Sequence, residues 1–118
     1  MYRTFLKSKI HRAVVTEADL NYEGSLTVDA TLMRAAGILP YEMVKVYNIN
    51  NGERFETYAI EGEPDSGVIC LNGAAARKGV PGDLIIITCY VMLSDDEIKG
   101  FQSVLIHVDA QNRIKEEK

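Results

Sequence analysis

The sequence predicts a small, mainly-β domain whose strands close into a compact barrel. Three observations support this class. β-branched and aromatic residues recur in alternating runs, an Asn-Gly pair separates two of these runs, and only one segment has clear helix start and stop signals. At 118 residues the chain has the size of one domain. Closing such strands into a barrel would remove exposed sheet edges.

The helical signals come first along the chain. Asp29 is a good N-cap, residues 30–36 form the predicted helix, and Gly37 is the left-handed stop. Residues 72–77, which read Asn-Gly-Ala-Ala-Ala-Arg, predict a short second helical turn.

A hairpin is the clearest strand signal. Residues 43–49 mix β-branched, aromatic and polar side chains in a roughly alternating run, and residues 53–60 lead away from them. Asn50-Asn51-Gly52 lies between the two runs. Asn and Gly tolerate positive φ, as such a turn requires.

The second half of the chain predicts two more strands. Residues 84–93 are β-branched and almost continuously apolar, so we expect a central strand buried on both faces. A turn at 81–83 leads into it. Residues 103–108 are another strand candidate, and the charged tail from 111 to 118 is expected to fray.

Composition narrows the function. The net charge of −4 argues against a nucleic-acid surface but not against an acidic substrate, because recognition depends on local cations. No apolar run reaches about 18 residues, which predicts no membrane span. Residues 1–7 do not fit a signal peptide, so a cytoplasmic location is expected.

The cysteines and the acidic run favour structural roles. Cys70 and Cys89 lie in apolar runs and predict buried, reduced thiols. The acidic run at 94–97 predicts a solvated turn and not a metal site, so no metal is expected.

The residues with the most chemical potential are Gly24 and Ser25. The Ser25 hydroxyl lies within reach of the Gly24 carbonyl, and attack there converts the amide to an ester. Elimination of the acyl group leaves dehydroalanine, and hydrolysis then gives a pyruvoyl group, an electrophilic cofactor made from the chain itself. Glycine at position 24 can hold an unusual backbone conformation that exposes this carbonyl. Gly-Ser is also a common turn pair, so the motif alone is weak.

Four segments give the motif its context. In order and spacing they resemble the pyruvoyl-dependent aspartate 1-decarboxylases, and the match covers almost the whole chain. The segments are Lys9-Ile10-His11-Arg12, Ala18-Asp19-Leu20-Asn21-Tyr22-Glu23-Gly24-Ser25, Asn51-Gly52-Glu53-Arg54-Phe55-Glu56-Thr57-Tyr58 and Leu71-Asn72-Gly73-Ala74-Ala75-Ala76.

The resemblance implies a fold and an activity. The fold is a closed six-stranded double-psi β-barrel with short helices. The chain would cleave itself between Gly24 and Ser25 into residues 1–24 and 25–118. The pyruvoyl group made from Ser25 would form a Schiff base with L-aspartate, which is decarboxylated to β-alanine and CO2 for pantothenate and coenzyme A biosynthesis. A homotetramer with pockets between subunits is also implied, and the sequence leaves open whether a helper protein assists maturation.

The resemblance further implies residue roles. Thr57 would donate to the oxyanion that develops on Gly24, and Tyr58 would protonate the carbanion. Arg54 suits a carboxylate because its planar guanidinium donates two parallel hydrogen bonds, and Lys9 adds a second charge. Thr57, Asn72 and the small residues Gly73, Ala74 and Ala75 would bind substrate, and Tyr47 would line the pocket. Tyr22 is close to Ser25 in the sequence and is a further candidate for the pocket lining. His11 alternates with Lys9, and it would assist processing, line the pocket or be a partly buried structural histidine. His107 has no matched role and is expected to be structural.

Two alternatives remain on sequence grounds. One is a non-catalytic small β-barrel binding module in which Gly24-Ser25 never reacts, and the other is an unprocessed regulatory homologue.

Overall fold

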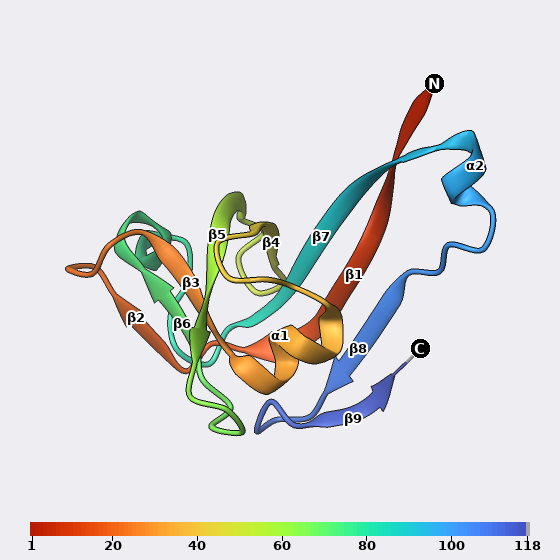
Figure 1. Cartoon of the computed structure of the whole chain (residues 1–118). Helices are drawn as coiled ribbons and strands as arrows, with labels where there is room; N and C mark the ends of the chain where they lie inside the picture. Colours follow the sequence, from red (N-terminus) through yellow and green to blue (C-terminus); the bar gives the residue numbers. More distant parts are fainter. Residues whose placement is uncertain (118) are drawn as a thin grey trace.

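The structure, a computed structural model, describes residues 1–117 and is mainly β (Figure 1). Nine strands form one hydrogen-bonded sheet in the order β2-β6-β3-β5-β4-β7-β1-β8-β9. The elements are β1 (Tyr2–Val14), β2 (Glu17–Asp19), β3 (Ser25–Asp29), α1 (Ala30–Ala36), β4 (Met43–Asn48), β5 (Arg54–Gly62), β6 (Ile69–Asn72), the 3-10 helix η1 (Gly73–Arg77), β7 (Leu84–Ser94), α2 (Asp95–Ile98), β8 (Val104–Val108) and β9 (Ile114–Glu117).

The core lies inside the curved sheet. Alternate residues of several strands point into it and are fully buried, namely Ile10, Leu26, Val28, Val44, Val46, Ile85, Ile87 and Ile106. This alternation follows from the two-residue period of a strand. The mainly-β class is therefore confirmed, and a sheet wrapped around one core agrees with a barrel. The six-stranded double-psi form stays a prediction.

The predicted caps of α1 are confirmed. The Asp29 side chain accepts a hydrogen bond from the Thr31 amide, and Gly37 has the left-handed φ of 69°. The hairpin is confirmed too, because β4 pairs antiparallel with β5 across the turn at 50–52, where Gly52 has φ 78°. The predicted helical turn after Asn72 is η1.

The prediction for β7 is correct only for its first half. Up to Thr88 this strand lies between β1 and β4, but beyond it β7 pairs with β1 alone. The two strands continue as an arm that projects from the core (Figure 1). Met92 in the arm is 64% exposed, so the expectation of burial on both faces is wrong there.

The C-terminal tail is not frayed between 114 and 117. These residues form β9, which pairs antiparallel with β8. The preceding loop is fixed by buried Asn112, whose side chain bonds to the backbone of Val14 and of Gly67. The run Lys115-Glu116-Glu117 is charged, so the sequence has no apolar alternation here that would predict a strand.

The acidic run after β7 is more ordered than a solvated turn. Ser94 and Glu97 form a reciprocal capping box at the start of α2, which has no buried residue, so the run is solvated as expected but forms a short helix. The run Ser-Asp-Asp-Glu carries the capping-box signature in the sequence.

Asp29 holds the end of β3 to a distant loop. Besides capping α1, its buried carboxylate accepts hydrogen bonds from the amides of Asp65 at 2.9 Å and Gly67 at 2.9 Å. One side chain therefore satisfies three backbone donors and fixes β3, which begins at Ser25.

We expect Asp29→Ala to lower the free energy of unfolding by about 2 kcal/mol or more, because it removes a cap and leaves buried donors unpaired. Urea unfolding, carried out in a Ser25→Ala background so that self-cleavage plays no part, measures this change. The matched control is Asp96→Ala, an exposed residue of α2 that should change stability by less than about 0.5 kcal/mol. Equal effects of the two variants would contradict the role of Asp29.

Candidate active site

Ser25 is the first residue of β3 and is only 1% exposed. β3 lies between β5, to which it is parallel, and β6, to which it is antiparallel. In the β3–β6 pair, Ser25 is directly opposite Asn72. Because opposite residues of paired strands project to the same face, the register itself brings the two side chains together.

A buried hydrogen-bond network surrounds the Ser25 hydroxyl. The Asn72 Nδ2 donates to Ser25 Oγ at 3.0 Å and to Thr27 Oγ1 at 2.8 Å. The Ser25 hydroxyl in turn donates to the Glu23 carbonyl at 3.4 Å. The Cys70 thiol donates to Asn72 Oδ1 at 3.1 Å. The nucleophile expected from the sequence is therefore held in a defined position next to the Gly24 peptide.

The loop before Ser25 packs closely on the start of η1. Gly73 has φ 62°, and a Cβ there would lie 2.7 Å from the Gly24 Cα and 2.8 Å from the Tyr22 carbonyl oxygen. Glycine is therefore required at position 73 for close backbone approach. Gly24 itself has no positive φ, so the unusual backbone conformation expected there is not of the left-handed kind.

A cavity of about 170 Å³ adjoins Ser25. Five of the predicted site residues line it, together with three that sequence reasoning missed. The predicted ones are Gly24, Ser25, Thr57, Ala74 and Ala75, and the others are Phe55, Glu56 and Lys78. Phe55 shares the alternation of Thr57 on β5, a pattern that could have identified it.

Arg54 and Tyr47 meet in a neighbouring cavity of about 220 Å³. The Arg54 guanidinium carbon lies 4.0 Å from the centre of the Tyr47 ring, a cation–π contact. Phe55 and Glu56 line both cavities, so the space beside Arg54 adjoins the space beside Ser25.

The Tyr47 phenol also bonds to Tyr90, with 2.9 Å between the two oxygens. Burial by itself raises the pKa of Tyr47, but the hydrogen bonds of Tyr90 and Thr88 and the charges of Arg54 and Lys45 lower that pKa overall. Tyr90 was not among the predicted site residues, and no motif in the sequence distinguishes it.

Lys9 lies on β1 and does not line the cavity beside Ser25 of its own chain. It alternates with core residue Ile10 on β1 and so projects away from the core. Lys9 lines neither the cavity beside Ser25 nor the one beside Arg54.

Tyr58, Tyr22 and His11 line neither of the two cavities. Tyr58 packs its ring 5.9 Å from that of Tyr41, although the β3–β5 register brings its backbone beside that of Ser25. Tyr22 is 53% exposed in the turn before Gly24.

His11 lies beside His107, with 5.2 Å between ring centres. Burial lowers the pKa of His11, and so do the positive charges of Lys9, His107 and Arg12. Both imidazoles lie at the β1–β8 pair, away from the Ser25 cavity.

Within residues 1–117, His, Cys, Asp and Glu side chains form no group of three that could hold a metal ion. In the same part of the chain, no helix is both long and apolar enough to cross a membrane. Cys70 and Cys89 are buried and unpaired with each other, as predicted.

Comparison with known proteins gives a consistent result. A family model described as aspartate decarboxylase matches residues 1–115. Proteins named aspartate 1-decarboxylase are similar over nearly their whole length. One from Syntrophus aciditrophicus is 59% identical over 98% of this chain and 99% of its own. One from Syntrophobacter fumaroxidans is 62% identical over 96% of this chain and 91% of its own length. One from Neisseria meningitidis is 58% identical over 98% of this chain and 91% of its own length.

Proposed function

Because this chain belongs to the aspartate decarboxylase family, we propose that it decarboxylates L-aspartate to β-alanine with a pyruvoyl group made from its own Ser25. The family membership rests on the match over residues 1–115 and on relatives of 52–62% identity. The observation that supports the proposal best is the buried Ser25 hydroxyl, held by Asn72 next to the Gly24 peptide.

Self-cleavage begins with attack of Ser25 Oγ on the Gly24 carbonyl carbon, which breaks the peptide C–N bond and gives an ester. Thr57 lines the same cavity as both residues, which supports it as the donor to the oxygen that becomes charged. Loss of the Ser25 Cα proton then expels the Gly24 carboxylate, and hydrolysis of the dehydroalanine releases ammonia.

The residues around Ser25 fit the product of this reaction. The Asn72 amide is a donor to oxygen at position 25, and Ala74 and Ala75 leave room beside it. The pyruvoyl ketone would condense with the substrate's amino group and, with its adjacent amide carbonyl, accept the electrons released with CO2.

The neighbouring cavity supplies the carboxylate recognition that aspartate requires. The Arg54 guanidinium, stacked on Tyr47, can grip a carboxylate through two parallel hydrogen bonds. Proposed substrate contacts also come from Asn72, Thr57, Lys9 and the backbone at 73–75, with Tyr58 as proton donor. Tyr47, Tyr22 and His11 are proposed to line the pocket.

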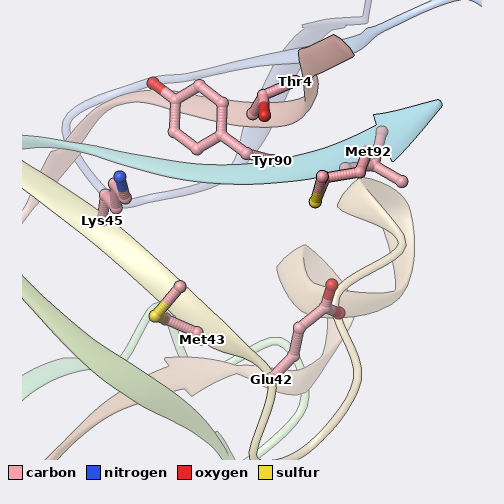
Figure 2. A pocket seen from close by; sticks show the side chains of 7 residues that line it. Thr4, Glu42, Met43, Lys45, Tyr90 and Met92 are labelled. Atoms are coloured by element: carbon pink, nitrogen blue, oxygen red, sulfur yellow. The ribbon is translucent and has the colours of Figure 1, made fainter. Parts of the chain in front are cut away.

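We propose a homotetramer whose sites lie between copies of the chain. Lys9 projects away from the core and does not line the Ser25 cavity of its own chain, so a second copy would supply it. An apolar surface suited to association lies at the base of the arm. There, Met43 of β4 and Met92 of β7 lie on opposite sides of a hollow of about 310 Å³ and are 58% and 64% exposed (Figure 2). A cytoplasmic location is proposed as well, because both buried cysteines are free thiols.

The first test is the mass of the chain under denaturing conditions. We expect two fragments, residues 1–24 and 25–118. The second should be lighter than a fragment retaining Ser25 by the mass of one ammonia, because the pyruvoyl group replaces serine. Ser25→Ala should stay intact. A wild-type chain that persists uncut would favour the non-catalytic binding module.

The second test separates cleavage from turnover. Tyr58→Phe removes only the phenolic hydroxyl, so it should still cleave normally but form β-alanine about 100-fold more slowly or worse, the loss expected for a general acid. Tyr2→Phe, at the exposed start of β1, is the matched control. Normal turnover by Tyr58→Phe would rule out the proton-donor role.

The third test asks whether two copies build one site. Ser25→Ala and Lys9→Ala chains, each inactive alone, are produced together. A site works only when a Lys9→Ala chain supplies the pyruvoyl group and a neighbouring Ser25→Ala chain supplies Lys9. Random pairing should give this combination at roughly a quarter of the sites in the mixed oligomer. Native mass spectrometry verifies that mixed tetramers form. Mixed tetramers without activity would show that each chain must supply both residues.

A further inference from the structure

The side chain of Cys70 lies directly behind Asn72 in the Ser25 network. Cys70 and Asn72 are two residues apart on β6, so both side chains project to the same face. The thiol donates to Asn72 Oδ1 at 3.1 Å, and Asn72 Nδ2 donates to Ser25 Oγ at 3.0 Å. All three residues are buried, with 6%, 3% and 1% exposure. Nothing in the proposed reaction uses this thiol as a nucleophile or a ligand.

The Asn72 amide can lie in either of two orientations, and its neighbours decide between them. In the observed one, Nδ2 donates to the hydroxyls of Ser25 and Thr27 and Oδ1 faces the thiol. In the flipped one, the amide NH2 would face Cys70, whose thiol would lose its 3.1 Å acceptor and keep only the longer contact of 4.0 Å with the Leu71 carbonyl. The S–H group of Cys70 therefore favours the orientation that directs an N–H at Ser25 Oγ.

This orientation matters for attack by Ser25. A hydroxyl oxygen has two lone pairs, and one of them accepts from Asn72 while the other stays free for the Gly24 carbonyl carbon. The N–H also stabilises negative charge on Oγ as the hydroxyl proton leaves. A flipped amide would direct an acceptor at Oγ and give neither benefit.

The surroundings keep the thiol in its donor form. Burial raises the pKa of Cys70, and the carboxylates of Glu17 and Asp19 on the adjacent strand β2 raise it further. Near neutral pH the sulfur therefore carries its proton and can donate it to Asn72.

We propose that Cys70 is a positioning residue for self-cleavage, and that it acts by holding the Asn72 amide with its donor toward Ser25. This inference rests on the proposed self-cleavage. In it, the hydrogen bond of the buried thiol sets the geometry of the Ser25 nucleophile. A hydrogen-bond donor is required at position 70, and sulfur itself is not.

The test compares two substitutions that differ in the donor. Cys70→Ala removes it, and should slow conversion of the precursor about 3- to 10-fold, the effect expected for one hydrogen bond. Cys70→Ser keeps an O–H donor and should cleave within about 2-fold of the wild type, on the same scale. Cys89→Ala is the matched control, because Cys89 is also a buried thiol but bonds to the Met43 carbonyl, away from the site. It should cleave at the normal rate.

A double-mutant cycle shows whether Cys70 acts through Asn72. If it does, Cys70→Ala should slow the Asn72→Ala variant no further, since the amide it orients is already gone. A purely structural role would instead slow both backgrounds by the same factor. Cys70→Val also lacks a donor, and its cleavage rate replaces that of Cys70→Ala if Cys70→Ala does not fold. Thermal unfolding of each precursor verifies that it is folded.

The outcomes separate this inference from the proposed function. A wild-type chain that never cleaves contradicts the proposed function itself. A wild-type chain that cleaves while folded Cys70→Ala or Cys70→Val cleaves equally fast overturns the role of Cys70. Cleavage of Cys70→Ser as slow as that of Cys70→Ala, or additive effects in the cycle, would overturn it too.

Discussion

The pairing of Ser25 with Asn72 across β3 and β6 is the constraint on which the rest of the site depends. It places an amide donor on the serine oxygen without any flexible loop, since both residues lie in strands. Alternation then adds Thr27 and Cys70 to the same face of this strand pair. A shift of one residue in register would turn Ser25 and Asn72 to different faces and dismantle the network. The capping and loop contacts of Asp29 hold the other end of β3, and so protect this register.

The fold also explains how a chain can be cut here without coming apart. Gly24 lies in the connection between β2 and β3, where no strand pairing would be lost on cleavage. On the N-terminal side, β1 pairs with β7 and β8, and β2 pairs with β6. These pairings hold residues 1–24 to the remainder of the domain. The close packing of Gly73 against Gly24 restrains the same connection.

The sequence predicted those features that local chemistry determines. The ends of α1 follow from Asp29 and Gly37, the hairpin from Asn51 and Gly52, and the core from period-two alternation. The arm, the strand β9 and the capping box of α2 were not predicted from the sequence. β9 is mostly charged and carries no burial signal in the sequence. The arm is apolar but has no second neighbouring strand, which depends on tertiary structure, whereas the capping box of α2 has a signature in its four residues.

The site was predictable in part for a similar reason. The resemblance identified Ser25, Thr57, Asn72 and the small residues after it, which the structure brings together. It could not reveal that Cys70 contacts Asn72, because a lone cysteine in an apolar strand looks like an ordinary core residue. Nor could it reveal that Lys9 stays outside the Ser25 cavity of its own chain, which depends on tertiary structure.

We infer that the folded register, and not the Gly-Ser dipeptide itself, makes the Gly24-Ser25 peptide bond reactive. Freshly translated precursor is kept in urea and then diluted into native buffer, while mass spectrometry follows the intact and cleaved chains alongside recovery of structure. We expect no cleavage in urea and conversion at Gly24-Ser25 only after the sheet has formed. Cleavage at the same rate in the unfolded chain would show that the folded register is not needed.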